Sequence, residues 1–136
     1  MNDKIRLSYV RILMVALVLG LVGKAVSPQF AGASAEKKVS MLLDGLQLMR
    51  AHLDLYRAQH GDSLPPTDSL AGFQAAMTRQ AGQFGPYVDD IPANPFNGLN
   101  TVRFNGEPAG ADKAGWRLDT RTGLFQADND VAYAAL

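Results

Sequence analysis

The chain has 136 residues, and its thirteen Lys and Arg balance thirteen Asp and Glu, so its formal net charge is zero. This balance removes the electrostatic case for nucleic-acid binding. The absence of cysteine excludes disulfides and any cysteine-based metal or redox site. The length allows one modest domain, and the first quarter of the chain differs in character from the rest.

An apolar segment lies near the N-terminus. Residues 12–23 read ILMVALVLGLVG without a charge, and the apolar stretch covers residues 7–26, about the twenty positions that a membrane-spanning helix needs. Lys4, Arg6 and Arg11 precede most of it, so the positive-inside rule predicts a cytoplasmic N-terminus and a head outside the cytoplasm. The segment therefore predicts a single transmembrane helix that anchors the chain.

A cleaved secretory signal is the alternative interpretation of this segment. A basic start and an apolar run are followed by small residues, AGASA, at residues 31–35. Cleavage there would remove the anchor and release a soluble head. The helical pattern continues beyond the apolar run, which favours the anchor.

An amphipathic helix is predicted next. Its apolar residues recur at steps of three and four, namely Val39, Leu42, Leu43, Leu46, Met49, Leu53 and Tyr56. Gly61 and the Pro65-Pro66 pair end the pattern. If the anchor and this stretch form one element, the helix covers residues 7–59 and is roughly 80 Å long at about 1.5 Å per residue. Pro28 would then kink the helix.

The residues after Pro66 predict a small head. Thr67 or Asp68 can cap a short helix that runs to about residue 80, with Leu70, Phe73 and Met77 spaced for a buried face. An irregular loop rich in proline and glycine follows at residues 82–98. Short strands are predicted at residues 101–104, 115–119 and 123–127, and the last two are joined as a hairpin.

Together these elements predict an α+β fold in which a long N-terminal transmembrane-plus-amphipathic helix packs on a small antiparallel β-sheet head. The expected divisions are 1–27 for the leader and transmembrane helix, 28–60 for its amphipathic continuation and 61–136 for the head. Phe104, Trp116 and Leu118 are expected in the core of the head, with Leu53 and Tyr56 packing from the helix.

The polar residues give no catalytic signature. His52 and His60 stand eight positions apart without a cysteine or a carboxylate in helical register, which favours solvent-exposed histidines over metal ligands. Asp89 and Asp90 lie in a turn without a nucleophile or base nearby in sequence, which favours a solvated turn over acid–base catalysis. No Walker, Rossmann or triad motif occurs. The sequence therefore predicts no enzyme, no catalytic residue and no cofactor.

Four segments together resemble the type IV pilin and type II secretion pseudopilin superfamily. They are VSPQF, LDLYRAQHG, YVDDIPANPFNG and GWRLDTRTGLFQAD, and the most specific parts are residues 91–98 and 115–128. The resemblance implies a pilin-like head on a helical spine, with subunits that stack through their N-terminal helices into a filament. It implies a bacterial inner-membrane location with a periplasmic or extracellular head. The implied partners are further copies or other pilin-like subunits and an assembly platform.

The N-terminus departs from the pattern of this family. If Pro28 corresponds to the family's helix proline, the prepilin-processing positions fall on Arg6, Leu7 and Arg11. The family carries glycine before the cut, phenylalanine or a methylated residue after it, and glutamate five residues into the mature helix. These departures predict that the leader is retained. They also favour a second function, a membrane-anchored binding or adaptor protein on a pilin-like scaffold that does not polymerise.

Calcium is the one metal that the resemblance brings into question, because major pseudopilins bind it in a C-terminal loop. Asp128 and Asp130 are the candidate ligands in this chain. Calcium takes about six to eight oxygen ligands, and this stretch lacks the longer loop that would supply them. No specific metal site is therefore expected.

Overall fold

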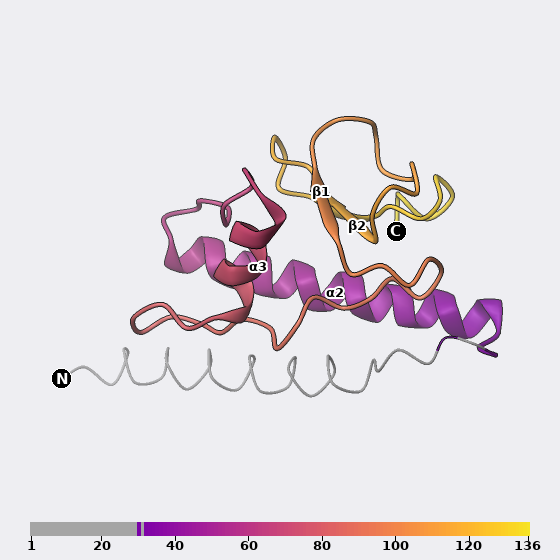
Figure 1. Ribbon diagram of the computed structural model, residues 1–136, viewed down its shortest axis with the longest axis horizontal. Coiled ribbons are helices and arrows are strands. Elements are labelled where there is room, and N and C mark those ends of the chain that lie inside the picture. Colours follow the sequence, from indigo (N-terminus) through magenta and orange to yellow (C-terminus); the bar gives the residue numbers. More distant parts are fainter. Residues whose placement is uncertain (1–29, 31) are drawn as a thin grey trace.

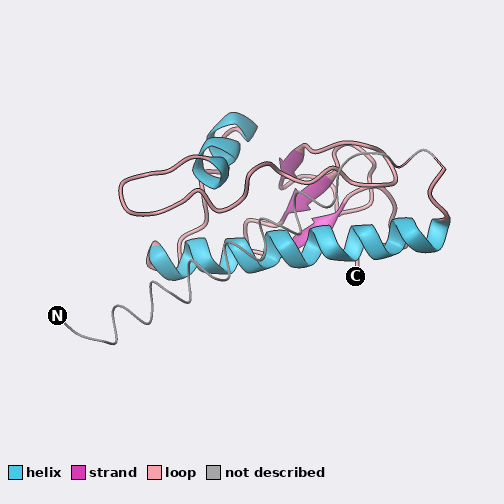
Figure 2. Cartoon of the chain, turned by 90° about the horizontal axis from the view of Figure 1, so that it is seen from below, coloured by secondary structure: helices cyan, strands magenta, loops and turns pink. Residues whose placement is uncertain are grey.

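The computed structural model describes residue 30 and residues 32–136. Its elements in chain order are α2 (Ala35–Gln59), α3 (Leu70–Thr78), β1 (Val102–Phe104), β2 (Trp116–Leu118) and β3 (Phe125–Ala127). Helix α2 lies along one side of these residues, and α3 and the strands lie beside it (Figures 1 and 2). The described residues therefore form an α+β fold built along one helix.

Helix α2 has a defined start and a defined end. Ser34 is in an extended conformation, with φ −65° and ψ 160°, and its side chain accepts a hydrogen bond from the N–H of Lys37. At the other end the cap is His60, and Gly61 follows with φ 61°, a conformation that glycine adopts without strain. The predicted end of the amphipathic helix is confirmed to within one residue.

The expected fold is wrong in its helix. Instead of one element over residues 7–59, α2 begins at Ala35, because the Ser34 cap and Gly32, with φ 88°, set the backbone before it outside helical geometry. No helix among the described residues is long and apolar enough to cross a membrane. The expected anchor, residues 7–26, and the expected kink at Pro28 lie outside the described residues.

The expected fold is also wrong in its sheet, which is mixed and not antiparallel. The strand order is β1-β2-β3. Strands β2 and β3 form the predicted antiparallel hairpin, with Leu118 opposite Phe125. Strand β1 instead runs parallel to β2, with Val102 opposite Trp116. Residues 105–115 carry the chain back to the start of β1, and a return of this kind makes the two strands parallel.

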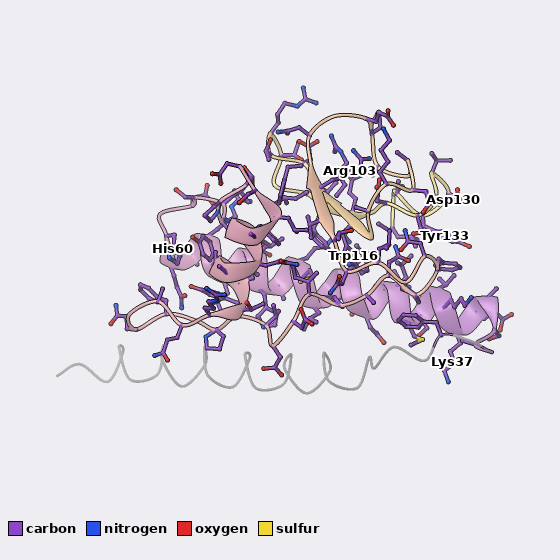
Figure 3. All side chains as sticks on the ribbon, in the orientation of Figure 1. Lys37, His60, Arg103, Trp116, Asp130 and Tyr133 are labelled. Carbon is purple, nitrogen blue, oxygen red and sulfur yellow. The ribbon has the colours of Figure 1, made fainter. Side chains whose placement is uncertain are left out.

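Trp116 lies at the centre of the core, between α2 and the sheet (Figure 3). Its side chain is fully buried, and its indole N–H donates to the carbonyl of Pro92 at 2.7 Å. The ring stacks on Phe125 with 5.4 Å between centroids. A Cβ at Gly45 would lie 3.0 Å from Cη2 of the indole. The missing side chain at Gly45 therefore lets the indole rest on the helix, which offsets the low helix propensity of glycine.

The buried face of α2 is wider than the predicted stripe. Its buried residues are Leu42, Gly45, Leu46, Leu48, Met49, His52 and Leu53. Val39, Leu43 and Tyr56, which were expected on the apolar face, are half-buried. The proline-rich loop contacts α2 near its end, where the hydroxyl of Tyr87 donates to Gln59 at 2.6 Å. The helix is therefore covered both by the sheet and by this loop.

Helix α3 closes the other part of the core. It begins after Ser69, one residue beyond the expected capping positions, and the Ser69 side chain accepts a backbone N–H at 3.0 Å. Phe73 and Met77 are fully buried, as their spacing predicted, whereas Leu70 is half-buried. Phe73 contacts the half-buried Phe104 of β1 with 5.5 Å between ring centroids. This aromatic pair joins α3 to the sheet.

Candidate interaction surface

The paired carboxylates of Asp89 and Asp90 lie on the surface beside α3. They line an open pocket of about 290 Å³ together with Gln74, Thr78 and Arg79. The one hydroxyl among the residues that line this pocket belongs to Thr78, and it donates to the backbone carbonyl of Gln74 at 2.7 Å. Asp90 accepts the N–H of the following residue at 2.8 Å. The residues that line the pocket therefore supply no activated nucleophile.

His52 is buried, so the expectation that it is exposed is wrong. Its side chain has no exposed surface, and Nδ1 lies 2.8 Å from the carbonyl oxygen of Leu48. A carbonyl only accepts, so Nδ1 carries the proton of the neutral ring. Nε2 has no hydrogen-bond partner among the described residues. Burial lowers the pKa of His52 and outweighs the bond with Leu48, which raises it. His60, by contrast, is half-buried and stacks on Tyr56 at 3.8 Å.

Acid is therefore expected to weaken the fold through His52. The unfolded chain takes up a proton below about pH 6.5, whereas the buried ring resists it. The stability that depends on the neutral ring is complete above this pH and is lost as the pH falls towards the lower pKa of the folded state. The free energy of unfolding should fall by about 1.4 kcal/mol for each pH unit in that window.

His52→Gln supplies the control, because glutamine does not titrate. Urea unfolding of both proteins between pH 7.5 and pH 5 measures the difference, for which the wild type should show the steeper decline. Equal slopes would mean that the folded and unfolded chains protonate His52 over the same pH range. That result would contradict a lowered pKa of His52 in the folded chain. The difference between the two curves removes the contribution of the other titratable groups.

A buried ion pair between Arg103 and Asp128, called here the ion-pair centre, organises the loop between β1 and β2. The Asp128 side chain is fully buried, and Nε and Nη2 of Arg103 donate to its two oxygens at 2.8 and 2.7 Å. The remaining guanidinium donors reach the backbone carbonyls of Asn105, Glu107 and Pro108 at 3.1, 2.7 and 2.8 Å. Every N–H of the guanidinium therefore has an acceptor.

Asp128 also collects backbone donors from the same loop. They are the N–H groups of Gly110, Ala111, Lys113 and Ala114, at 3.0, 3.3, 3.1 and 3.0 Å. Burial alone raises the pKa of Asp128, but the hydrogen bonds from Arg103 and from the backbone together hold this pKa below its ordinary value. This one carboxylate therefore binds four backbone N–H groups within residues 110–114.

The two calcium candidates lie in different surroundings. Asp128 directs both carboxylate oxygens to Arg103 and to the loop. Asp130 is exposed, and its side chain accepts the N–H of Ala132 at 2.9 Å. Among the described residues there is no group of three or more His, Asp or Glu side chains that could hold a metal ion.

Asn94 joins the proline-rich loop to the hairpin. Its side chain is fully buried, and its Nδ2 donates to the carbonyl of Gly115 and to Oδ1 of Asn129, both at 2.9 Å. Its Oδ1 accepts the N–H of Phe96 at 2.9 Å.

The sequence analysis did not predict the roles of Asn94 and Arg103. The available signal for Arg103 was a charge between two apolar residues of a short strand, VRF.

The residues expected in the core of the head differ in their burial. Trp116 and Leu118 are fully buried, and Leu53 is almost fully buried. Phe104 and Tyr56 are half-buried. The processing positions Arg6, Leu7 and Arg11 lie outside the described residues.

An open groove runs between the C-terminal half of α2 and the turn of the β2–β3 hairpin, and it is called here the hairpin groove. One part, of about 290 Å³, is lined by Arg50, Leu53, Asp54, Arg57, Thr122, Gly123, Leu124 and Phe125. The adjoining part, of about 370 Å³, is lined by Arg57, Asp62, Ser63, Leu64, Thr120, Arg121, Thr122 and Gly123. Arg57 pairs with Asp62 at 2.9 Å within it. Both parts are open to solvent, and charged side chains line each of them, which suits a contact surface better than an enclosed small-molecule site.

Large apolar side chains are exposed in several places on the described surface. Leu124, on the hairpin groove, is 45% exposed, and Val131 is 74% exposed. Val131 directly follows Asp130 in the sequence. Figure 3 shows Asp130 and Tyr133 at the opposite end of the head from His60. Tyr133 stacks on Phe96 with 4.8 Å between centroids. These residues are candidates for contact with another protein.

The described residues thus form a head with open contact surfaces and with buried hydrogen bonds that join its loops to its strands. Comparisons of the chain with protein-family models, with curated proteins and with solved structures find no match.

Proposed function

We propose that the chain is a structural subunit, or an accessory pseudopilin, of a type IV pilus-like or type II secretion filament. The observation that carries the proposal is that the two segments with the most specific resemblance are joined in the structure. Residues 91–98 and 115–128 meet where Asn94 donates to Gly115 and where Trp116 donates to Pro92. They form one unit that packs on α2. Such a unit suits a subunit whose function is to present a fixed shape.

The polar chemistry of the head supports the same proposal. The hydrogen bonds of the ion-pair centre and of Asn94 go to other groups of the head itself, most of them backbone groups. Polar side chains that are used in this way rigidify a structure and are not available to a substrate. The surfaces that remain open are the hairpin groove and the exposed apolar residues, which suit contacts between subunits.

In this proposal the chain is held in the bacterial inner membrane by its apolar segment, residues 7–26, with the head in the periplasm or outside the cell. The length of the segment and the basic residues Lys4, Arg6 and Arg11 before its centre support this location. The partners are further copies or other pilin-like subunits and an assembly platform. Nucleic acid is not a partner, because the net charge is zero.

Leu17→Arg tests the membrane part of this proposal. A charge in the middle of the apolar segment costs about 2.5 to 3.5 kcal/mol during insertion, so the variant should be lost from the membrane fraction. Leu17→Met keeps the segment apolar and should remain with the membrane. Carbonate extraction followed by immunoblotting measures both. Equal retention of the two variants in the membrane would contradict the proposed anchoring.

The size of the particle that the chain forms tests the proposed function. Membranes from cells that produce the chain are extracted in mild detergent and sedimented through a gradient. A filament subunit is expected to sediment in multimers that contain several copies. The adaptor function, which the residues Arg6, Leu7 and Arg11 favour, predicts a single copy, alone or bound to a different protein. A single copy at every protein concentration would therefore count against a filament subunit.

A further inference from the structure

The chain contains two Asn-Gly pairs, Asn97-Gly98 and Asn105-Gly106. In such a pair the backbone nitrogen of glycine can attack the side-chain amide of the preceding asparagine, because glycine has no side chain to block the approach. Both glycines have positive φ, 72° at Gly98 and 73° at Gly106. The two pairs are alike in sequence, so their surroundings decide which of them reacts.

Both polar atoms of the Asn97 side chain are hydrogen-bonded. Its Nδ2 donates to Oδ1 of Asp112 and to a backbone carbonyl, both at 3.0 Å, and its Oδ1 accepts the N–H of Leu99 at 3.1 Å. The attacking atom is also engaged, because the N–H of Gly98 donates to the carbonyl of Asn94 at 2.7 Å. A reaction at Asn97 would have to break all these bonds.

Asn105 has the opposite surroundings. It is exposed and has φ 59°, and the N–H of Gly106 has no acceptor within the part of the chain that the structure describes. Two side chains instead donate hydrogen bonds to the oxygens of Asn105. The Nη1 of Arg103 donates to the backbone oxygen of Asn105 at 3.1 Å, and the hydroxyl of Thr120 donates to Oδ1.

We propose that Asn105 is a self-modification site, at which the side-chain amide is converted to a carboxylate through a cyclic imide. The nitrogen of Gly106 loses its proton to water and bonds to Cγ of Asn105, and the carbonyl electrons move to Oδ1. When the carbonyl re-forms, the bond from Cγ to Nδ2 breaks, and the nitrogen takes a proton and leaves as ammonia. Water then opens the imide at either carbonyl, which gives aspartate or isoaspartate.

Each of the two donors stabilises a charge that this reaction creates. Loss of the Gly106 proton places negative charge on the backbone oxygen of Asn105, where the guanidinium of Arg103 already donates. Attack on Cγ places negative charge on Oδ1, where the hydroxyl of Thr120 donates, as an oxyanion hole does in an enzyme. The fold thus promotes the reaction at Asn105 and opposes it at Asn97.

The product changes the loop that the ion-pair centre holds. Isoaspartate adds one carbon to the backbone path at residue 105, next to the carbonyls of Asn105 and Glu107 that accept from Arg103. Either product adds a negative charge beside this guanidinium. The modification is therefore expected to alter the bonds between Arg103 and this loop.

Peptide mass spectrometry of the full chain, aged at mildly alkaline pH, tests this proposal. In urea both pairs should react at similar rates. In the folded protein Asn105 should react at least about tenfold faster than Asn97 and no slower than it does in urea. A folded rate at Asn105 below its rate in urea would overturn the proposal.

Thr120→Val and Thr120→Ser provide the matched pair. Valine keeps the shape without the hydroxyl and should slow the reaction at Asn105, whereas serine should keep the wild-type rate. The rate at Asn97 in the same sample reports folding, because it rises if the variant unfolds. An unchanged rate at Asn105 in folded Thr120→Val would show that the hydroxyl takes no part and would overturn the proposed assistance by the fold.

Discussion

Trp116→Ala is expected to lower the free energy of unfolding by about 3 to 5 kcal/mol. The indole is fully buried, stacks on Phe125 and donates to the carbonyl of Pro92. Its removal leaves a cavity between α2 and the sheet and an unpaired carbonyl. Gly45 cannot fill this cavity, because it has no side chain. Urea unfolding of the folded variant measures the loss.

Two further variants separate the causes of this loss. Trp116→Phe keeps an aromatic ring against Phe125 but removes the N–H, so it should cost less than Trp116→Ala. Val131→Ala, at a side chain that is 74% exposed, should change stability by less than about 0.5 kcal/mol. A midpoint for Trp116→Ala equal to that of Val131→Ala would show that the core is assigned wrongly.

Asp128→Ala is expected to cost about 3 to 5 kcal/mol, because it leaves a largely buried guanidinium without its partner. The Arg103 side chain is only 16% exposed, and four backbone N–H groups of the loop lose their acceptor at the same time. The loop at residues 105–115 should therefore lose its order as well. Amide hydrogen exchange at Gly110 and Ala114 measures this effect beside the change in overall stability.

Asp130→Ala is the matched control for this substitution. Asp130 is exposed and accepts one backbone N–H, so its removal should cost less than about 1 kcal/mol and leave exchange in the loop unchanged. If Asp128→Ala were as mild as Asp130→Ala, the ion-pair centre would not hold the loop.

Local patterns were sufficient to predict the hairpin, α3 and the end of α2. Alternation of apolar and polar residues indicates the β2 and β3 strands, and the tight connection between them fixes their antiparallel pairing. The spacing of Phe73 and Met77 indicates the buried face of α3. In each case the decisive contacts join residues that are close in sequence.

The direction of β1 could not be predicted in this way. It depends on the path of residues 105–115, and this loop is hydrogen-bonded to Arg103 and Asp128, which are 25 residues apart in sequence. The start of α2 did have a local signal, because Ser34 precedes Glu36 in the first turn. The small residues around Ser34 also fit a cleavage region or a continuous helix, so this signal alone does not decide between the three.

The burial of His52 does not follow from the apolar stripe alone, because the buried face of α2 is wider than that stripe. Gly45, Leu48 and His52 form a second row at steps of three and four beside that stripe. A glycine inside an otherwise good helix was the signal, because it often marks a close approach by another group. Here that group is the indole of Trp116.

Cross-linking between copies tests the proposed filament most directly. The chain has no cysteine, so an introduced pair reports only its own contacts. Double variants combine Leu124→Cys on the hairpin groove with Leu99→Cys or Val131→Cys, all at exposed positions. Head-to-tail contacts between two different surfaces generate open chains, so at least one double variant, treated with a short bismaleimide in cells, should give a ladder beyond the dimer. Each single variant should stop at the dimer. Monomers and dimers alone from every double variant would contradict the proposed assembly.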